Sequence, residues 1–258
     1  PHRLISNTDL AFQGSNVLGL GFTMPETTAQ ELIERNIRNS EVLFPYVNGG
    51  DLNTRPDSSG SRWIINFFDW PEDRARDFPD CFEIVEEKVK PERQRVDPSG
   101  NFVLRKPLPQ RFWHYADKRP ALYSAIRNLS HVLAITQASN VVLPLRVPRG
   151  SVFDQKLIIF PSDDFGDLAL LSSAPHYWWT IKYTSTLGAG INYSPNLVSL
   201  TFPRPHCTDR MRTEGKSLDR GRREFMLGRQ LGLTKTYNLV HDPAIGDIEV
   251  ARLRRMHV

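Results

Sequence analysis

Four cationic side chains are packed into the segment KVKPERQR, residues 88–95, around the helix-breaking Pro91. Arg and Lys side chains at the end of a helix can reach the phosphates and the guanine edges of duplex DNA. Two further cations follow after a short loop. The cations expected to contact DNA are Lys88, Lys90, Arg93, Arg95, Lys118 and Arg119. The alternative interpretation is an ordinary solvated helix end.

A second segment, YTSTLGAGINY at residues 183–193, has a composition that suits direct contact with bases. Its glycines allow close backbone approach to a partner, and Asn can pair with adenine through two hydrogen bonds. We expect three side chains here to read bases, with backbone approach at the glycines. The candidate residues are Lys182, Thr186, Gly188, Gly190, Asn192 and Tyr193. The alternative is a glycine-rich connector that contacts nothing.

Two other patterns suggest catalysis or cofactor binding only superficially. The run GSNVLGLG, residues 14–21, resembles a nucleotide-binding loop, but its glycines do not follow the GxGxxG spacing. Glu86 and Lys88 form a Glu-x-Lys pair typical of nucleases, but they lie on a predicted helix without an obvious Asp partner. We therefore expect no catalytic residue and no bound cofactor in this chain.

The cysteines and histidines do not form a metal-ligand pattern. Cys81 and Cys207 are far apart, and neither belongs to a CxxC pair. His206 lies directly beside Cys207, which is poor geometry for sharing a zinc ion. The sequence predicts no metal site and two free thiols, as is typical of a cytoplasmic protein.

The charge of the chain is modest in total but uneven in distribution. The 258 residues carry a net charge of +4, with no apolar run long enough to cross a membrane and no secretory signal. Residues 204–235 hold nine basic and four acidic residues, whereas residues 1–203 sum to about −1. A local basic stripe is what phosphate binding requires, because neutralised phosphates release condensed counterions. The alternative is a solvated helix face.

The elements that would position these residues alternate between helices and short strands. In the first half, a capping box at Thr23 and Glu26 predicts a helix over 24–38, and an aromatic and β-branched run predicts a strand over 63–68. Residues 42–60 and 96–109 are rich in turn-forming residues and are expected to be loops.

The second half begins with strands and ends with helices. Strands are expected over 131–137, 140–147 and 152–160, followed by a helix over 165–186 that Pro175 kinks or divides. The prolines of 203–205 mark a domain boundary, and a helical hairpin of 214–231 and 244–257 follows. The sequence thus predicts an α+β fold. Residues 1–205 form a mixed-sheet recognition domain with flanking helices, and residues 206–258 form a helical tail.

Five phrases distributed along nearly the whole chain carry a family resemblance. In order they are FQGSNVLGLGF (12–22), SRWIINFFDWP (61–71), EEKVKPER (86–93), ADKRPALY (116–123) and GLTKTYNLVHDP (232–243). Together they resemble the C-terminal target recognition region and helical tail of MmeI-like (type IIL) restriction-modification enzymes, which methylate adenine in DNA. The Asn/Asp-Pro-Pro-Tyr/Phe motif of adenine methyltransferases is absent, and the first residue is Pro1. We therefore expect the DNA-reading part of a larger enzyme.

This resemblance implies partners and a cofactor for the parent enzyme. The parent would use S-adenosylmethionine and flip an adenine out of the duplex, while this chain holds and reads the surrounding DNA. In the resembled family the segment before Asn192-Tyr193-Ser194 looks like part of the base-reading surface. Relatives often carry polar or charged residues where this chain has Gly188 and Gly190. The expected partners are duplex DNA and the parent's own methyltransferase domain, without a membrane.

A second hypothesis from a different class is a scaffold module. Such a module would pack on the parent methyltransferase and contact DNA only weakly. One continuous positive, concave face would favour DNA reading, whereas scattered charge and a large exposed apolar patch would favour scaffolding.

Overall fold

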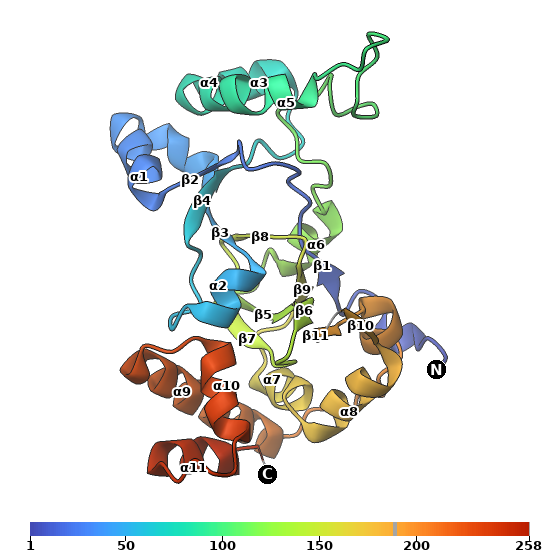
Figure 1. Ribbon diagram of the computed structural model, residues 1–258, viewed down its shortest axis with the longest axis vertical. Coiled ribbons are helices and arrows are strands. Elements are labelled where there is room, and N and C mark those ends of the chain that lie inside the picture. Colours follow the sequence, from blue (N-terminus) through green and yellow to red (C-terminus); the bar gives the residue numbers. More distant parts are fainter. Residues whose placement is uncertain (188–189, 258) are drawn as a thin grey trace.

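Three small β-sheets organise the chain in the computed structural model, which describes residues 1–187 and 190–257. Helices cover these sheets on several sides, and a group of helices closes the C-terminal end (Figure 1). The predicted α+β class, with a mixed sheet and a helical C-terminal segment, is confirmed. In the described part of the chain, no helix is long and apolar enough to cross a membrane.

The upper lobe in Figure 1 is built on the sheet with strand order β2-β4-β3-β8. Its strands are β2 (Thr23–Met24), β4 (Arg62–Ile65), β3 (Leu43–Val47) and β8 (Val152–Phe153). The helices around it are α1 (Glu26–Arg35), α3 (Glu72–Arg76), α4 (Pro79–Lys88) and α5 (Lys90–Arg93). One hydrophobic cluster, drawn from residues 17–115 and Val152, fills this lobe.

The lower lobe is built on the sheet with strand order β1-β9-β5-β7. Its strands are β1 (Phe12–Gln13), β9 (Leu157–Phe160), β5 (His131–Thr136) and β7 (Leu145–Pro148). All four residues of β9 are buried, as expected of an apolar run between two neighbouring strands. The helices α2 (Gly49–Thr54), α6 (Pro120–Ile126) and α7 (Phe165–Leu171) supply buried residues to its cluster.

The two lobes are joined by paired strands. Strand β3 of the upper sheet runs parallel to β8, with Tyr46 opposite Val152, and β8 leads directly toward β9 of the lower sheet. The Tyr46 hydroxyl donates to the Asp154 carboxylate at 2.5 Å, and the Ser15 amide donates to the Phe153 carbonyl at 2.7 Å. The junction is therefore a hydrogen-bonded part of both lobes.

The C-terminal tail contains three helices, so the predicted two-helix hairpin is wrong in detail. They are α9 (Asp209–Arg229), α10 (Leu233–His241) and α11 (Ile248–Arg255). The segment GLTKTYNLVHDP, expected to be a connector, mostly forms α10. Its Leu233, Tyr237 and Val240 are buried in the lower lobe's cluster. The boundary at residue 205 stays a prediction, and the hydrophobic packing of the lower lobe continues across it.

Of three further predictions about helices and loops, one is confirmed and two differ from the structure. The predicted division near Pro175 is confirmed, because α7 ends at Leu171 and α8 (Ala174–Tyr183) begins with Ser173 as its N-cap. The loop expected over 42–60 instead contains β3 and α2. The predicted helix 24–38 is shorter and continues as a 3-10 turn over Ile37–Glu41.

Candidate nucleic-acid interface

The strongest concentration of positive charge lies between α4 and α6. Residues 88–119 include nine basic and three acidic residues, a net charge of +6. Five of these cations are exposed and, within the described part of the chain, lie beyond ion-pair distance of any carboxylate. They are Lys88, Arg95, Arg105, Lys106 and Arg111. We call these five residues the unpaired cations.

A hollow of about 850 Å³ is lined by three of the unpaired cations, Arg105, Lys106 and Arg111. One wall is the segment 103–108, which carries Arg105 and Lys106, and the other is the segment 114–118 with Arg111 beside it. Of the described lining residues only Asp117 is acidic, and its carboxylate pairs with Arg119 at 3.1 Å. The hollow is therefore lined mainly by positive and uncharged groups, which suits a polyanion.

Lys118 and His114 border this hollow but are already engaged by the protein. Lys118 pairs with the Asp69 carboxylate, and this contact lowers the pKa of Asp69. The His114 ring is bonded through Nε2 to the Trp70 carbonyl at 2.7 Å, and burial lowers its pKa. His114 is thus neutral near pH 7 and adds no charge to the hollow.

Of the predicted DNA-binding cations, Arg93 needs correction, whereas Arg119 is partly exposed but already bonded to the protein. Arg93 is completely buried, and its guanidinium donates to the carbonyls of Val17 and Leu18 at 2.8 and 3.0 Å. A buried guanidinium cannot reach a phosphate, so Arg93 has a structural role. Arg119 donates to the Gln13 side chain at 3.0 Å and to the Gly14 carbonyl at 3.3 Å, which ties the segment around β1 to α6.

The remaining predicted cations in KVKPERQR differ in availability. Lys88 and Arg95 are exposed and belong to the unpaired cations. Lys90 pairs with Glu86 at 2.6 Å and lies 5.1 Å from the centre of the Phe112 ring. Lys88 and Arg95 are therefore the better candidates for phosphate contact.

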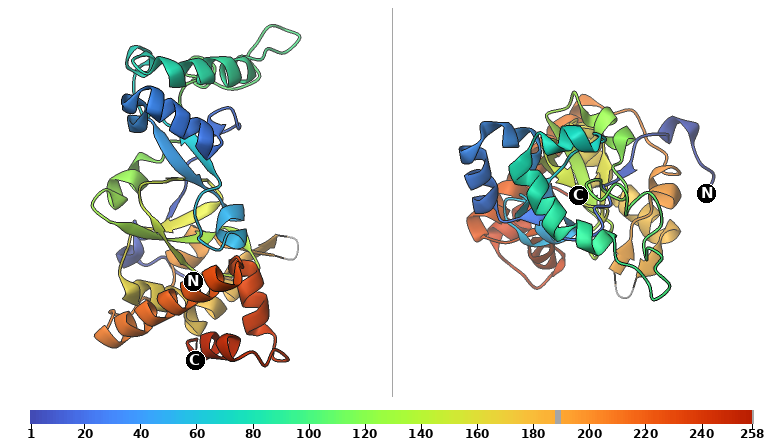
Figure 2. Two further views of the ribbon diagram at one scale, coloured as in Figure 1. Left: turned by 90° about the vertical axis from the view of Figure 1, so that its left-hand side faces the viewer. Right: turned by 90° about the horizontal axis from the view of Figure 1, so that it is seen from above.

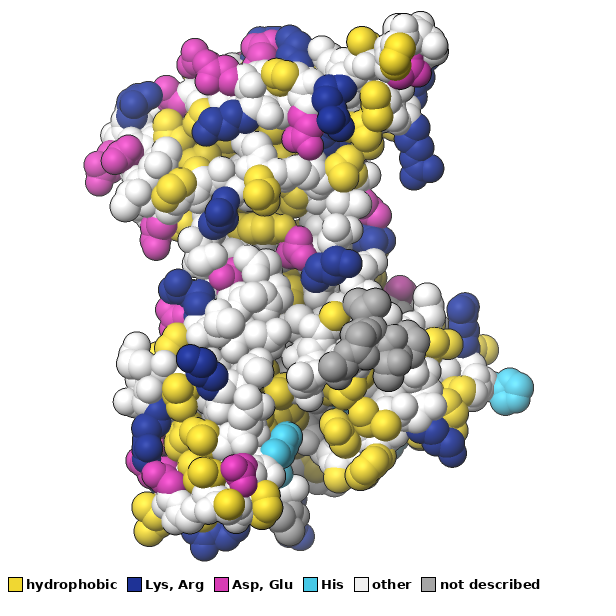
Figure 3. All heavy atoms as spheres, viewed as in Figure 1, with side chains coloured by type: hydrophobic (Ala, Val, Ile, Leu, Met, Phe, Trp, Pro, Cys, Tyr) yellow, Lys and Arg dark blue, Asp and Glu magenta, His cyan; other side chains and the backbone are white. Residues whose placement is uncertain are grey.

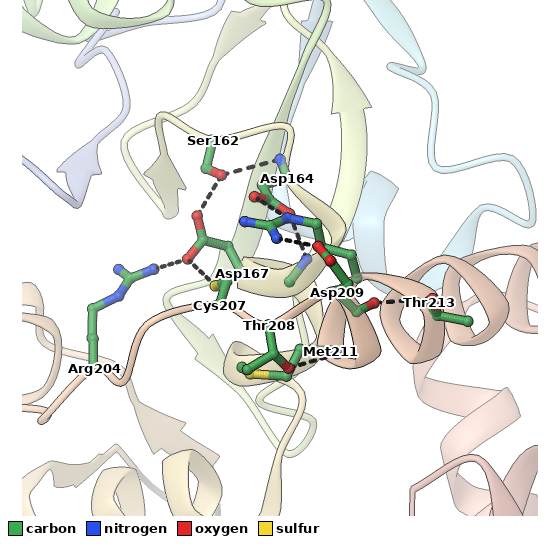
Figure 4. A network of polar contacts seen from close by, with 11 residues as sticks. Ser162, Asp164, Asp167, Arg204, Cys207, Thr208, Asp209, Met211 and Thr213 are labelled. Carbon is green, nitrogen blue, oxygen red and sulfur yellow. Dashed lines mark hydrogen bonds and ion pairs between the residues drawn. The ribbon is translucent and has the colours of Figure 1, made fainter.

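The basic stretch at 204–235 is partly neutralised by ion pairs, most of them at the surface. Around the start of α9, Arg204 pairs with Asp167 at 2.5 Å (Figure 4). Arg212 pairs with Asp164 at 3.0 Å. Farther along, Arg220 pairs with Glu224, and Arg229 pairs with both Asp247 and Glu249. The other four cations outside these pairs and the buried Arg222 are exposed and lie beyond ion-pair distance of any carboxylate in the described part of the chain: Arg210, Lys216, Arg223 and Lys235. This stretch therefore stays a second candidate for phosphate contact.

The second candidate segment forms the β-hairpin of β10 (Ser185–Leu187) and β11 (Gly190–Asn192). It is joined to β6 (Ala138–Ser139), with Asn192 opposite Ala138. Lys182 is exposed in the last turn of α8, immediately before the hairpin. Gly188 and the Thr186 side chain lie outside the described residues.

Tyr193 also requires correction. Its side chain is fully buried, and its hydroxyl lies 3.0 Å from Nε2 of His176, which is equally buried. The ring packs edge-on against Phe160 of β9. Tyr193 therefore anchors the base of the β10–β11 hairpin in the core. Of the described residues in this group, Lys182 is exposed and Gly190 and Asn192 are partly exposed.

The two candidate regions face the same side of the molecule. In both views of Figure 2, the loop after α5 and the β10–β11 hairpin extend toward one side, from the upper and lower lobes respectively. The surface narrows to a waist between the lobes in Figure 3. The arrangement thus presents two protrusions on either side of a narrowed middle.

Comparisons with known proteins find a related fold. The sequence matches no protein-family model and no curated protein. The solved structure of the type IIL restriction-modification enzyme MmeI in complex with DNA matches 99% of this chain, with a TM-score of 0.66 and 17% identity. The type IIG restriction endonuclease BpuSI matches 99% of the chain with a TM-score of 0.43 and 11% identity. The chain spans about a third of either protein, 32% and 30% of their lengths.

Proposed function

We propose that this chain is the DNA target recognition part of a larger adenine-N6 DNA methyltransferase or restriction-modification enzyme. It binds duplex DNA and reads its sequence for a catalytic domain elsewhere in the parent. The fold shared with MmeI, whose solved structure includes DNA, supports this proposal. S-adenosylmethionine would bind to the parent's methyltransferase domain, and this chain would contain neither the cofactor site nor the catalytic residues.

The observation that carries the proposal is the set of unpaired cations, three of which line the hollow. Surface cations without carboxylate neighbours retain their attraction for phosphate, because no internal ion pair has to be broken first. The loop after α5, which carries Arg95, Arg105 and Lys106, extends toward the same side as the β10–β11 hairpin, and this allows one duplex to meet both. In this arrangement, the upper lobe holds the backbone and the hairpin approaches the bases.

Fluorescence anisotropy of labelled duplex DNA at several salt concentrations tests the holding function. The Arg105→Ala/Lys106→Ala variant should bind all duplexes more weakly, with a log–log salt slope smaller by roughly 1 for each phosphate that the variant no longer neutralises. The control is Arg212→Ala/Arg220→Ala, which removes the same charge from exposed residues that are already ion-paired. The proposal fails if the chain does not bind at low salt, or if both variants weaken binding equally.

The reading function is tested in the full-length parent. Lys182→Ala and Asn192→Ala should change which sequences are methylated, because each good base contact contributes roughly 1–3 kcal/mol of discrimination. Sequencing of methylated sites in cells carrying each variant measures the change, with Lys216→Ala on α9 as the control. An unchanged site at full activity in both variants would place the reading surface elsewhere.

A second candidate function, packing on the methyltransferase domain, is favoured by the exposed face of α8. Tyr177, Trp178 and Ile181 are all exposed there, Trp178 by 65%. Trp178→Ser should lower the parent's methylation rate at every site without changing the sites. The same variant of this chain should bind DNA as before. Reduced DNA affinity in the variant would assign the α8 face to DNA contact.

A further inference from the structure

The loop after α5 carries a short β-hairpin, residues 95–103, with an apolar pair directly below its turn. Val96 and Phe102 are opposite each other in an antiparallel bridge, and the Val103 amide donates to the Arg95 carbonyl at 2.9 Å. Directly opposed residues of an antiparallel pair project from the same face. Val96 and Phe102 therefore form one apolar surface, and they are 57% and 44% exposed.

The turn of this hairpin is fixed by its own hydrogen bonds. The Asp97 carboxylate accepts from the amides of Ser99 and Asn101 at 2.9 and 3.0 Å, and the Asp97 amide donates to the Asn101 carbonyl at 2.8 Å. Gly100 adopts a φ of +81°, which a side chain would disfavour. The turn thus has a fixed conformation without a partner, although Val96 and Phe102 beside it expose apolar area to water.

The charge around this apolar pair indicates the kind of partner. Residues 95–111 hold four cations and one carboxylate, Asp97, which is bonded to amides of its own turn. Arg95 is part of the hairpin, Arg105 and Lys106 follow it directly, and Arg111 lines the same hollow as Val103. These are four of the five unpaired cations. A protein partner would have to desolvate these cations or supply carboxylates for them. Duplex DNA supplies phosphates to the cations and base steps to Val96 and Phe102.

We propose that the 95–103 hairpin enters the minor groove of duplex DNA and that Phe102, supported by Val96, wedges against a base step. The neighbouring cations hold the phosphates on either side. This inference rests on the proposed DNA-binding function and adds a mechanical step to it. Because neither apolar side chain can hydrogen-bond to a base, the wedge opens and bends the duplex instead of reading it.

The experiment combines two probes on one mixed-sequence duplex of roughly 30 base pairs, long enough to report a bend. End-attached dyes report bending through energy transfer, and 2-aminopurine placed in turn at successive pyrimidine–purine steps reports unstacking. Binding of the unaltered chain should raise the energy transfer and increase the 2-aminopurine signal. Phe102→Ala should abolish both changes while keeping the salt slope of binding, and Phe102→Leu should keep part of the bend. Ile248→Ala, which removes an exposed apolar side chain from α11, is the control.

The possible outcomes distinguish failure of the wedge from failure of the proposed DNA-binding function. If the unaltered chain binds with a normal salt slope but neither bends nor unstacks the duplex, the wedge is overturned and DNA binding stands. Unchanged bending by Phe102→Ala also overturns the wedge. If Phe102→Ala leaves DNA distortion intact but abolishes methylation by the parent, the wedge is overturned and Val96 and Phe102 contact protein instead. Failure of the unaltered chain to bind DNA at low salt contradicts the proposed function itself.

Discussion

Arg93 and Arg95 are two positions apart in sequence but lie in opposite surroundings. The Arg93 guanidinium is enclosed, bonded to two backbone carbonyls and 5.9 Å from the centre of the Phe22 ring. Burial lowers its pKa, and two of its nitrogens, Nε and Nη1, have no hydrogen-bond partner among the described residues. Arg95 is exposed and is one of the unpaired cations. The two residues thus separate a stabilising role, that of Arg93, from the binding role proposed for Arg95.

Arg93→Ala should therefore reduce the free energy of unfolding by about 2–4 kcal/mol, because it leaves a cavity and two unpaired carbonyls. Arg93→Met should cost less, since it restores volume and removes an incompletely paired buried charge. Arg95→Ala should change stability by less than about 0.5 kcal/mol and weaken DNA binding instead. Urea denaturation and DNA anisotropy of all three variants measure these effects. A stable Arg93→Ala variant with weakened DNA binding would restore the phosphate-contact interpretation.

His176 makes the stability of the protein depend on pH. Its Nδ1 lies 2.8 Å from the Leu171 carbonyl and must donate, so its Nε2 accepts the proton of the Tyr193 hydroxyl. Burial lowers the pKa of His176 to about 4. Burial likewise lowers the pKa of His257 to about 4, and its Nε2 lies 2.6 Å from the Tyr237 hydroxyl. Both rings are neutral in the folded protein.

Because the unfolded chain takes up these protons near pH 6.5, the stability contributed by His176 is complete above that pH and declines as pH falls toward 4. The loss for His176 alone should reach about 2 kcal/mol by pH 5. Urea denaturation between pH 7 and pH 5 should show a smaller pH dependence for His176→Asn than for the unaltered chain. Equal dependence in both proteins would show that His176 is not the proton-linked group.

At the scale of elements, two glycines of α9 have contrasting roles. A Cβ at Gly215 would lie 1.9 Å from the Phe165 carbonyl oxygen at the start of α7, whereas a Cβ at Gly228 would meet nothing within 4 Å. Gly215→Ala should destabilise the protein by about 1–3 kcal/mol, because α7 and α9 must separate. Gly228→Ala should instead stabilise it by up to about 1 kcal/mol through helix propensity. Chemical denaturation gives both values, and effects of the same sign would contradict this account of the helix crossing.

Local patterns predicted some elements well and others poorly. The break between α7 and α8 could be predicted, because Pro175 restricts its own backbone and the residue before it. Helix α10 was missed because Gly232 and Pro243 suggested a connector, although Leu233, Thr236, Tyr237 and Val240 already follow helical spacing.

The candidate site shows the same limits. Arg105, Lys106 and Arg111 could not be singled out, because neighbouring prolines marked a loop and because acidic residues elsewhere cancelled their charge in the sum over residues 1–203. The burial of Arg93 could not be predicted, since it depends on carbonyls about 75 positions away in sequence. Local patterns located KVKPERQR, but only the fold determines which of its cations face outward.

At the scale of the whole molecule, two hydrophobic clusters divide the chain, and the tail belongs to one of them. Buried tail residues complete the lower lobe's cluster: Leu218, Phe225, Met226, Leu233, Tyr237, Val240, Val250 and Leu253. Deleting residues 206–258 should therefore expose apolar surface and produce an unstable or aggregating chain. Size-exclusion chromatography and thermal unfolding measure the outcome. A monomeric remainder that unfolds as cooperatively as the whole chain would support an independent recognition domain ending at residue 205.

The paired strands at the junction fix the distance between the two lobes. The parallel pairing of β3 with β8 and the bond between Tyr46 and Asp154 hold the lobes together, so the two protrusions proposed to contact DNA keep one spacing. On a helical duplex, each inserted base pair rotates one contact about 35° relative to the other. If a parent enzyme relies on both contacts, only one number of base pairs would be accepted between the base step wedged by Phe102 and the bases read by the β10–β11 hairpin.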